Sequence, residues 1–402
     1  MDETTVLPQI PAARTCPFAP PDAYGLLRDA APVTAVALPG GKTAWAVTRL
    51  SDVRAMLIRP DVSSDPRRPG FPDAYPDPDD DDACALPQLI EMDPPQHSHY
   101  RRMLVSELTA RRVNELRPGI QRLVDDLIDA MLAAGPPVDL VSAFALAIPS
   151  TVICQLLGVP YDDHRFFQTR TDVLVSTTVG DDEKATAYAE LLGYLDRIVT
   201  AKEAEPTDDI LGRLIANQVA TGELSHDMLV NTAALLLLAG HESTASTIAL
   251  GVLTFLRHPD QRALLASDPA AAVGAADEMV RFHSLGDVDV ARTASDDFEL
   301  GGQHVAAGDG LLPILSAANR DPAAFERPDD VDITRPNPRQ HVGFGYGPHL
   351  CLGHNLARAQ LEIAYRTLFD RIPTLRLAVP VDELHLKTDS QIFGLHEMPV
   401  TW

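Results

Sequence analysis

Basic residues are scarce in this chain. Its 402 residues include 33 Lys and Arg against 57 Asp and Glu, which gives a formal net charge of −24 at pH 7. Contacts with nucleic-acid phosphates need a basic face, so this balance argues against nucleic-acid binding. The acidic excess instead favours solubility.

Cysteines are also few. The four cysteines, Cys16, Cys84, Cys154 and Cys351, show no paired spacing of the kind that zinc sites or redox motifs have. This usage fits a reducing cytoplasm, and we expect the protein to be cytoplasmic.

Long apolar runs and targeting signals are missing as well. The longest apolar run, Ala233 to Gly240, is far shorter than the roughly 18 residues that a membrane span needs. The acidic start, Met1 to Thr5, lacks the basic and apolar regions of a signal peptide. No linker divides the chain, and 45% hydrophobic residues can build a sizeable core. We therefore expect one domain over residues 1–402, with no membrane association.

One cysteine stands between a glycine-rich turn and a helical pattern. Residues 344–353 read Phe-Gly-Tyr-Gly-Pro-His-Leu-Cys-Leu-Gly, and apolar residues then recur at helical spacing as far as Ile363. A helix N-terminus offers N–H donors and the positive end of a dipole, which lower the pKa of a thiol. Taken alone, Cys351 is more typical of a buried structural cysteine.

A second segment predicts one long buried helix. Leu229 to Phe255 is mostly apolar, Ser225 is a plausible N-cap, and His258-Pro259 is a stop signal. In its middle, the hydroxyls of the sequence Ala-Gly-His-Glu-Ser-Thr at 239–244 can bond carbonyls one turn back and open the helix for a ligand or waters. The alternative is a crossing of small residues with a solvated Glu242. A zinc-protease helix is excluded, because the second histidine of that motif is missing.

Charged pairs at helical spacing occur in two further segments. Glu278 and Arg281 lie three apart, which by itself predicts only a weak surface ion pair. His97 and Arg101 lie four apart on a helix that opens with prolines, and each would ordinarily be a solvated charge.

Together these four segments resemble the cytochrome P450 superfamily, with the motifs in the family's order. Phe-x-x-Gly-x-x-x-Cys-x-Gly is similar to its cysteine-ligand loop, and the resemblance runs from about Asp93 to Trp402. It is strongest to soluble bacterial members of the actinobacterial type. It implies a mainly α fold with small β-sheets, a triangular helical prism with a long central helix over haem.

The resemblance also implies roles for individual residues. Haem b would be bound with the Cys351 thiolate as axial iron ligand, and Glu242 and Ser243 match the acid–alcohol pair that relays protons. The family usually has threonine at the second position, and serine lacks the methyl group that restricts χ1. Further haem contacts are implied at Ala239, Phe344, Gly345 and Gly353, and propionate contacts at His97, Arg101, Arg292 and His349. A structural trio is implied at Glu278, Arg281 and Arg335.

The substrate pocket is assigned only by family position. The proline- and aspartate-rich stretch Asp65 to Gln88 would be a lid that frames the entrance together with Thr171 to Gly193. Such a pocket would hold its substrate mainly by apolar burial, although its candidate residues could equally be core. The candidates are Leu86, Val173, Leu235, Ala239, Val288 and Ile392.

Outside these motifs, the pattern predicts strands at Val33 to Ala37 and Thr43 to Val47 and helices from about Pro95 to Arg281. Extended segments are expected to return at Asp289–Ala294, Phe298–Val305 and Leu311–Leu315.

The resemblance predicts a haem-thiolate monooxygenase that inserts one atom of dioxygen into an apolar or amphipathic small molecule. Hydroxylation or epoxidation in natural-product tailoring or xenobiotic oxidation is expected. The chain has no Rossmann fingerprint or flavin segment, so electrons would come from a ferredoxin and a ferredoxin reductase. In this family the ferredoxin, a small acidic protein, docks beside the cysteine loop. The candidate contacts there are Arg111, Arg112, Arg339 and Arg358.

Two other functions remain open at this point. One is a haem-thiolate enzyme that uses peroxide or rearranges its substrate, which a retained acid–alcohol pair argues against. The other is a non-catalytic haem carrier or gas sensor, for which no signalling region is visible. A monomer is expected in each case.

Overall fold

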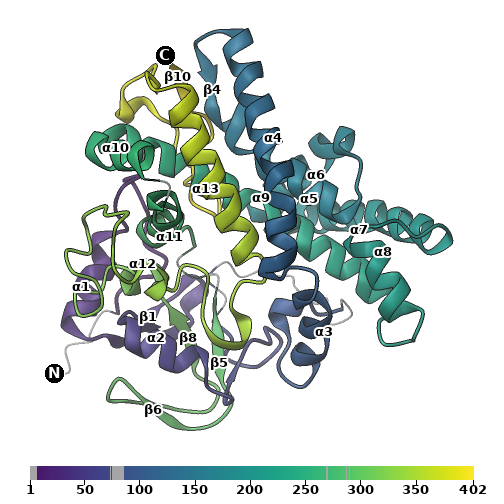
Figure 1. Ribbon diagram of the computed structural model, residues 1–402. Helices are drawn as coiled ribbons and strands as arrows, with labels where there is room; N and C mark the ends of the chain where they lie inside the picture. The colour runs from purple at the N-terminus through teal and green to yellow at the C-terminus, as the bar shows by residue number, and fades with distance from the viewer. Residues whose placement is uncertain (1–6, 73, 75–85, 269, 287, 289) are drawn as a thin grey trace.

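The computed structural model describes residues 7–72, 74, 86–268, 270–286, 288 and 290–402 (Figure 1). Its α-helices are α1 Asp22–Ala30, α2 Leu50–Leu57, α3 Gln96–Val105, α4 Ala110–Ala134, α5 Ala147–Leu157, α6 His164–Val175, α7 Asp181–Ala204, α8 Ile210–Leu214, α9 His226–Arg257, α10 Pro259–Ser267, α11 Ala271–His283, α12 Leu315–Ala318 and α13 His354–Arg371. Its strands are β1 Val33–Ala37, β2 Thr43–Val47, β3 Val62–Ser63, β4 Val138–Asp139, β5 Arg292–Ala294, β6 Phe298–Leu300, β7 Gln303–Val305, β8 Gly310–Pro313, β9 Arg376–Leu377 and β10 Pro399–Thr401.

Helix α9 forms the centre of the molecule, with α13 and α4 crossing in front of it in the view of Figure 1. It has 32 residues and begins where the sequence predicts, because the Ser225 hydroxyl accepts the N–H of Met228. It is the only described helix long and apolar enough to cross a membrane, but 72% of its most apolar window is buried inside the protein. Its apolar faces are therefore covered by neighbouring helices, as in the core of a soluble protein.

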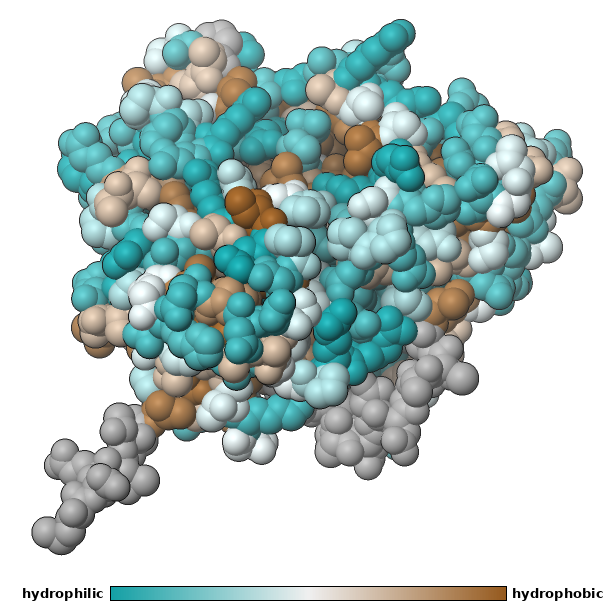
Figure 2. Space-filling view, turned by 90° about the horizontal axis from the view of Figure 1, so that it is seen from below, coloured by the Kyte–Doolittle hydropathy of each residue, from teal (hydrophilic) through white to brown (hydrophobic). Residues whose placement is uncertain are grey.

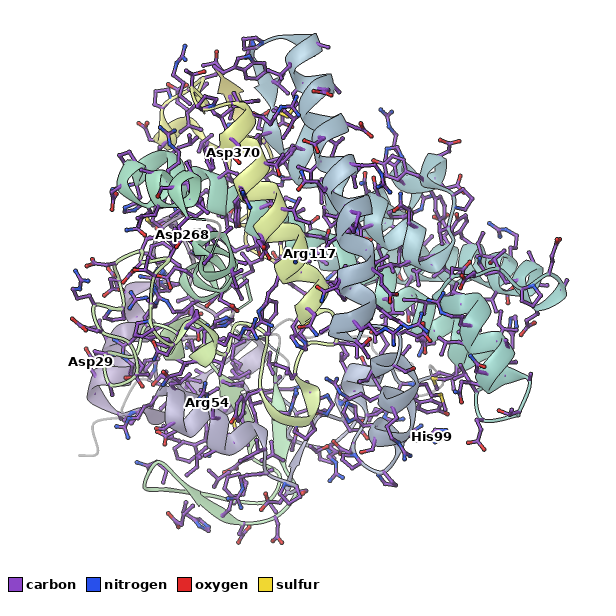
Figure 3. The ribbon with its side chains drawn as sticks, in the orientation of Figure 1. Asp29, Arg54, His99, Arg117, Asp268 and Asp370 are labelled. Carbon is purple, nitrogen blue, oxygen red and sulfur yellow. The ribbon has the colours of Figure 1, made fainter. Side chains whose placement is uncertain are left out.

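Helices α4 and α13 lie side by side over this core. Arg117 of α4 points toward α13 (Figure 3), where its Nη2 lies 2.6 Å from an oxygen of Glu362. Apolar residues of α4 and α13 also belong to the same buried cluster as apolar residues of α9. The start of α13, which follows Cys351, is thereby fixed against two helices.

The main sheet has five strands in the order β1-β2-β8-β5-β3 and lies beside α1 and α2. Strands β1 and β2 pair antiparallel over the predicted residues, whereas β2 and β8 are parallel. A second sheet has the order β4-β10-β9, and β6 and β7 form a hairpin. The sequence predicted these extended regions but not their ends: Phe298–Val305 is split by the hairpin turn, and α12 begins at Leu315.

Part of the predicted lid cannot be compared with the structure. The acidic run Asp79 to Asp82 and Cys84 lie outside the described residues, as does Asp289. Of the stretch Asp65 to Gln88, the structure describes 65–72, 74 and 86–88.

Candidate active site

A cavity of about 320 Å³ lies between the middle of α9, the end of α11 and the loop before α13. Apolar side chains and glycines supply most of its wall. Ala239 and Ser243 face it from α9, Phe344 and Cys351 from the loop, and Ile392 from the C-terminal segment. The cavity therefore brings together three motifs that are far apart in the sequence.

The cysteine loop is held in a tight turn by its own backbone. Gly345 and Gly347 have φ values of 71° and 72°, which non-glycine residues rarely adopt. The N–H of Cys351 donates to the carbonyl of Phe344 at 2.8 Å. A side chain at Gly347 would also meet the carbonyl of Leu57, with its Cβ only 2.8 Å away. The loop thus packs directly on the end of α2.

The Cys351 sulfur lies at the N-terminus of α13, as the sequence predicts. Burial raises the pKa of its thiol. The N–H groups of Gly353 and His354 and the positive charges of Arg101 and Arg358 act in the opposite direction. These donors and charges all favour a thiolate at this position, which is the form of cysteine that binds metals.

Four groups that can carry positive charge gather beside the loop. The rings of His97 and His349 stack with centroids 3.9 Å apart. Arg101 donates to the carbonyl of Leu350, and Arg292 Nη1 donates to that of Ala291 at 2.7 Å. Burial lowers the pKa of Arg292 to about 10, and burial together with the neighbouring cations lowers that of His349 to about 3.

This cluster fits the two propionates of haem. No described carboxylate forms an ion pair with any of the four groups, and both ring nitrogens of the buried His97 lack a hydrogen-bond partner among the described residues. Buried cations and orphaned nitrogens are costly unless an anion meets them. A mostly apolar cavity bordered by a thiol and by two arginines and two histidines suits an iron porphyrin dianion.

The trio Glu278, Arg281 and Arg335 comes together in the core. Arg281 donates to both oxygens of Glu278 at 2.7 and 2.8 Å, and Arg335 Nε lies 3.1 Å from each of them. Both arginines also donate to main-chain carbonyls, including that of Asp330. Because the three side chains are nearly inaccessible, this is a buried network rather than a surface ion pair.

On the opposite wall, α9 is continuous through its polar residues. The Ser243 hydroxyl lies 3.3 Å from the carbonyl of Ala239, one turn back, and the Thr247 hydroxyl donates to the carbonyl of Ser243 at 2.8 Å. The predicted back-bonding is present, but it does not interrupt the helix. Thr244, the second hydroxyl of the segment that the sequence pointed out, also faces the cavity.

Glu242 lies beside Ser243 but does not line the cavity. Its carboxylate forms a buried ion pair with Lys387, and the two side chains are 3% and 14% exposed. The predicted alternative of a solvated Glu242 is therefore wrong. Burial and the charge of Glu242 raise the pKa of Asp172, while Lys387 opposes this shift. Lys387 is a partner that the sequence did not indicate, since it lies 145 residues away in no motif.

Comparison with known proteins agrees with this geometry. A model of the cytochrome P450 family matches residues 182–397. Cytochrome P450 105A3 of Streptomyces carbophilus is 47% identical over 98% of this chain and 96% of its own length. The crystal structure of mycinamicin VIII C21 methyl hydroxylase from Micromonospora griseorubida, bound to mycinamicin VIII, has a TM-score of 0.93 at 41% identity and covers 98% of this chain and 100% of that one. The chain belongs to the cytochrome P450 family.

Membership confirms the predicted fold class and cofactor. A second relative, vitamin D3 dihydroxylase of Streptomyces griseolus, is 45% identical over 100% of this chain and 98% of its own length. This P450 is a haem-thiolate monooxygenase of the bacterial type that acts on small molecules.

The predicted pocket residues of this P450 do not all reach the cavity. Ala239 and Ile392 line it, whereas Leu235 and Val288 are buried and Val173 is half-buried, and none of the three faces it. Leu86 lines a separate cavity of about 380 Å³ between α7 and α9. Family position did not determine which side chains meet this cavity.

The arginines predicted to contact a redox partner differ in accessibility. Arg111 and Arg112 lie near carboxylates of their own chain, Glu115 at 3.3 Å and Glu107 at 3.7 Å. Arg339 has a side chain that is 67% exposed, whereas that of Arg358 is only 16% exposed and pairs with the buried Asp277. Arg358 is therefore part of the interior behind the cysteine loop and is poorly placed to meet a partner.

Proposed function

We propose that this P450 hydroxylates a large apolar or amphipathic natural product in a tailoring step. The observation that carries the proposal is the mostly apolar cavity facing Cys351, with Leu285, Val290 and Ile392 on its wall. Relatives that match over most of the chain support it by name. They include pentalenic acid synthase, 45% identical, and 20-oxo-5-O-mycaminosyltylactone 23-monooxygenase of Streptomyces fradiae, 43% identical.

In this proposal the chain's residues hold the cofactor and supply protons. Cys351 binds the iron, and His97, Arg101, Arg292 and His349 hold the propionates. Bound haem supplies the activation of dioxygen. One oxygen atom enters a C–H bond of the substrate and the other leaves as water, which consumes two electrons and two protons. Ser243 positions a proton at the cavity wall, and Glu242 passes protons to it.

The electrons come from a ferredoxin and its reductase, and docking takes place on the surface beside the cysteine loop, where Arg339 is exposed. We also propose that residues 1–402 form one domain that works as a cytoplasmic monomer. The face drawn in Figure 2 supports a monomer, because apolar side chains among the described residues are scattered there in small patches.

A compound panel tests the substrate class. Purified holoenzyme is mixed with macrolides, terpenes, steroids and small aromatic compounds, and the low-spin to high-spin shift of its spectrum is recorded. We expect the large apolar or amphipathic compounds to shift it and to be hydroxylated with ferredoxin, reductase and dioxygen. Turnover only with peroxide, or binding without oxidised product, would instead support the two other functions.

Replacing the cysteine tests the ligand assignment. We expect Cys351→Ser to abolish the thiolate-type spectrum of the reduced carbon monoxide complex, while Cys154→Ser, a change at a buried cysteine that does not line the cavity, retains it. A thiolate spectrum that survives in Cys351→Ser would assign the iron to another residue.

Electrostatic docking predicts a rate that depends on salt. We expect the first electron transfer from ferredoxin to slow steeply as ionic strength rises, because exposed charges are screened over about 10 Å at 0.1 M salt. Reduction by dithionite serves as the control. A rate that does not change with salt would place the donor on a surface other than the one beside the cysteine loop.

A further inference from the structure

A buried carboxylate lies directly behind the cysteine loop and has no role in the site described above. Asp277 of α11 is completely inaccessible to solvent and precedes Glu278 of the structural trio. Its Oδ1 accepts hydrogen bonds from Arg358 Nε at 2.7 Å and from His341 Nε2 at 3.1 Å. Its Oδ2 has no hydrogen-bond partner among the described residues and lies 3.6 Å from Nε of Arg339.

The hydrogen bonds fix the tautomer of His341. Its Nδ1 accepts the N–H of Gly343 at 3.1 Å, so the ring proton is on Nε2 and is donated to Asp277. Gly343 has no room for a side chain, since a Cβ there would lie 2.7 Å from Val280 of α11. His341 therefore ties the backbone at the start of the cysteine loop to Asp277 through a neutral ring.

Both donors to Asp277 also touch Phe344. The guanidinium carbon of Arg358 lies 4.7 Å from the centre of the Phe344 ring, and the His341 ring centre lies 5.6 Å from it. Phe344 lines the cavity, and its carbonyl accepts the N–H of Cys351. Asp277 thus sets the positions of His341 and Arg358. These two side chains flank Phe344, whose carbonyl accepts the hydrogen bond from Cys351.

The same contacts determine how much positive charge the sulfur experiences. Arg358 is one of the cations that stabilise the Cys351 thiolate, and the carboxylate of Asp277 partly neutralises it. Arg339 adds a second cation at the outer side of Asp277, with its side chain mostly in solvent.

We propose that Asp277, His341 and Arg358 form a positioning cluster that sets the reduction potential of the thiolate-bound iron, with Arg339 as its connection to the surface. Asp277 holds the potential down by neutralising Arg358, and Arg358 holds it up. The inference does not depend on the identity of the substrate or of the electron donor.

Charge-changing variants of the holoenzyme test this with a potentiometric titration, using dithionite and no protein donor. Reduction adds one negative charge at the iron, so nearby positive charge favours it. We expect Asp277→Asn to shift the midpoint potential upward and Arg358→Gln to shift it downward. The double variant Asp277→Asn/Arg358→Gln should return toward the wild-type value. Arg366→Gln, on the same helix but paired with Asp370 at the surface, is the control and should not shift it.

A purely structural role would give a different result. It would lower thermal stability and thiolate-type carbon monoxide binding in both single variants, with potentials unchanged or shifted in the same direction. That outcome overturns the proposal. If Asp277→Asn does not retain haem, Arg358→Gln and the exposed Arg339→Gln decide: both should lower the potential, Arg339→Gln by less, and unchanged potentials in both overturn it.

Discussion

The Ser243 hydroxyl has more rotational freedom than a threonine hydroxyl would have, because no methyl group restricts χ1. It lies at the cavity wall and makes a long back-bond to Ala239. We expect Ser243→Ala to retain haem and the thiolate-type spectrum, but to form several-fold less product per electron consumed. The ratio of product to NADPH consumed in the reconstituted system measures this. We expect Ser243→Thr to raise the ratio above that of the wild type.

Thr232 offers a matched control for that change. It lies on the same helix, and its hydroxyl makes the same kind of back-bond, to Met228 at 2.7 Å, but it does not line the cavity. Thr232→Ala should leave the coupling unchanged. Normal coupling in Ser243→Ala would remove the hydroxyl from the proton path.

The Glu242–Lys387 pair predicts a clear effect on stability. Lys387→Met leaves a buried carboxylate without its cation, which costs about 3–5 kcal/mol. We expect the urea midpoint to fall accordingly, and the double variant Lys387→Met/Glu242→Gln to recover most of the loss. Equal losses in the single and double variants would mean that the pair contributes packing rather than charge.

At this scale, the sequence revealed residues whose partners are close in sequence or form a motif. Glu278 and Arg281 are three residues apart, so their pairing followed from helical spacing. Lys387 and Asp277 were missed, because their partners come from other elements and no periodicity connects them. Leu86 lines a cavity other than the one that faces Cys351, since family position does not specify side-chain direction.

Helices α9 and α13 cross at a glycine, and this crossing predicts how well the core tolerates added volume. A Cβ at Gly251 would lie 2.1 Å from the hydroxyl oxygen of Tyr365, which donates to the carbonyl of Thr247. We expect Gly251→Ala to destabilise the protein by about 1–3 kcal/mol through overpacking. Urea unfolding of the holoenzyme measures this loss.

Gly193 in α7 is the matched control, because no heavy atom lies within 4 Å of a Cβ built there. Gly193→Ala should be neutral or stabilise by up to about 1 kcal/mol through helix propensity. If both variants have the same stability, the two helices separate more easily than the close contact implies.

Element bounds followed from the sequence where a local signal existed. The Ser225 cap and the His258-Pro259 stop gave the ends of α9, and the short apolar segments gave β1 and β2. The hairpin within Phe298–Val305 was missed, although Gly301 and Gly302, both at positive φ, mark its turn.

Over the whole molecule, stability should fall on the alkaline side through one histidine. His226 at the start of α9 bonds Asp196 at 2.9 Å and Glu203 at 3.1 Å, both on α7, and these bonds raise its pKa above 6.5. A raised pKa gives stability that is fully present below about pH 6.5 and is lost as pH rises through the folded-state value.

We therefore expect the thermal midpoint of wild type to decrease between about pH 6 and pH 8, and this decrease to become smaller in His226→Gln and in Asp196→Asn. Asp277 has the opposite effect, at acid pH. Its pKa is lowered because the hydrogen bonds from His341 and Arg358 outweigh burial, so the stability that it contributes is lost as pH falls below about 3.8. An alkaline decrease that persists unchanged in His226→Gln would assign it to other groups.

The gathering of His97, Arg101, Arg292 and His349 has a consequence for the life of the chain in the cell. Guanidinium groups and histidine nitrogens held inside the protein without an anionic partner cost stability, so a newly made polypeptide is less stable until a dianionic porphyrin joins them. Folding and cofactor uptake are thereby coupled. Cells grown with little iron should accumulate less of this protein, because the unfilled chain opens more often and is degraded.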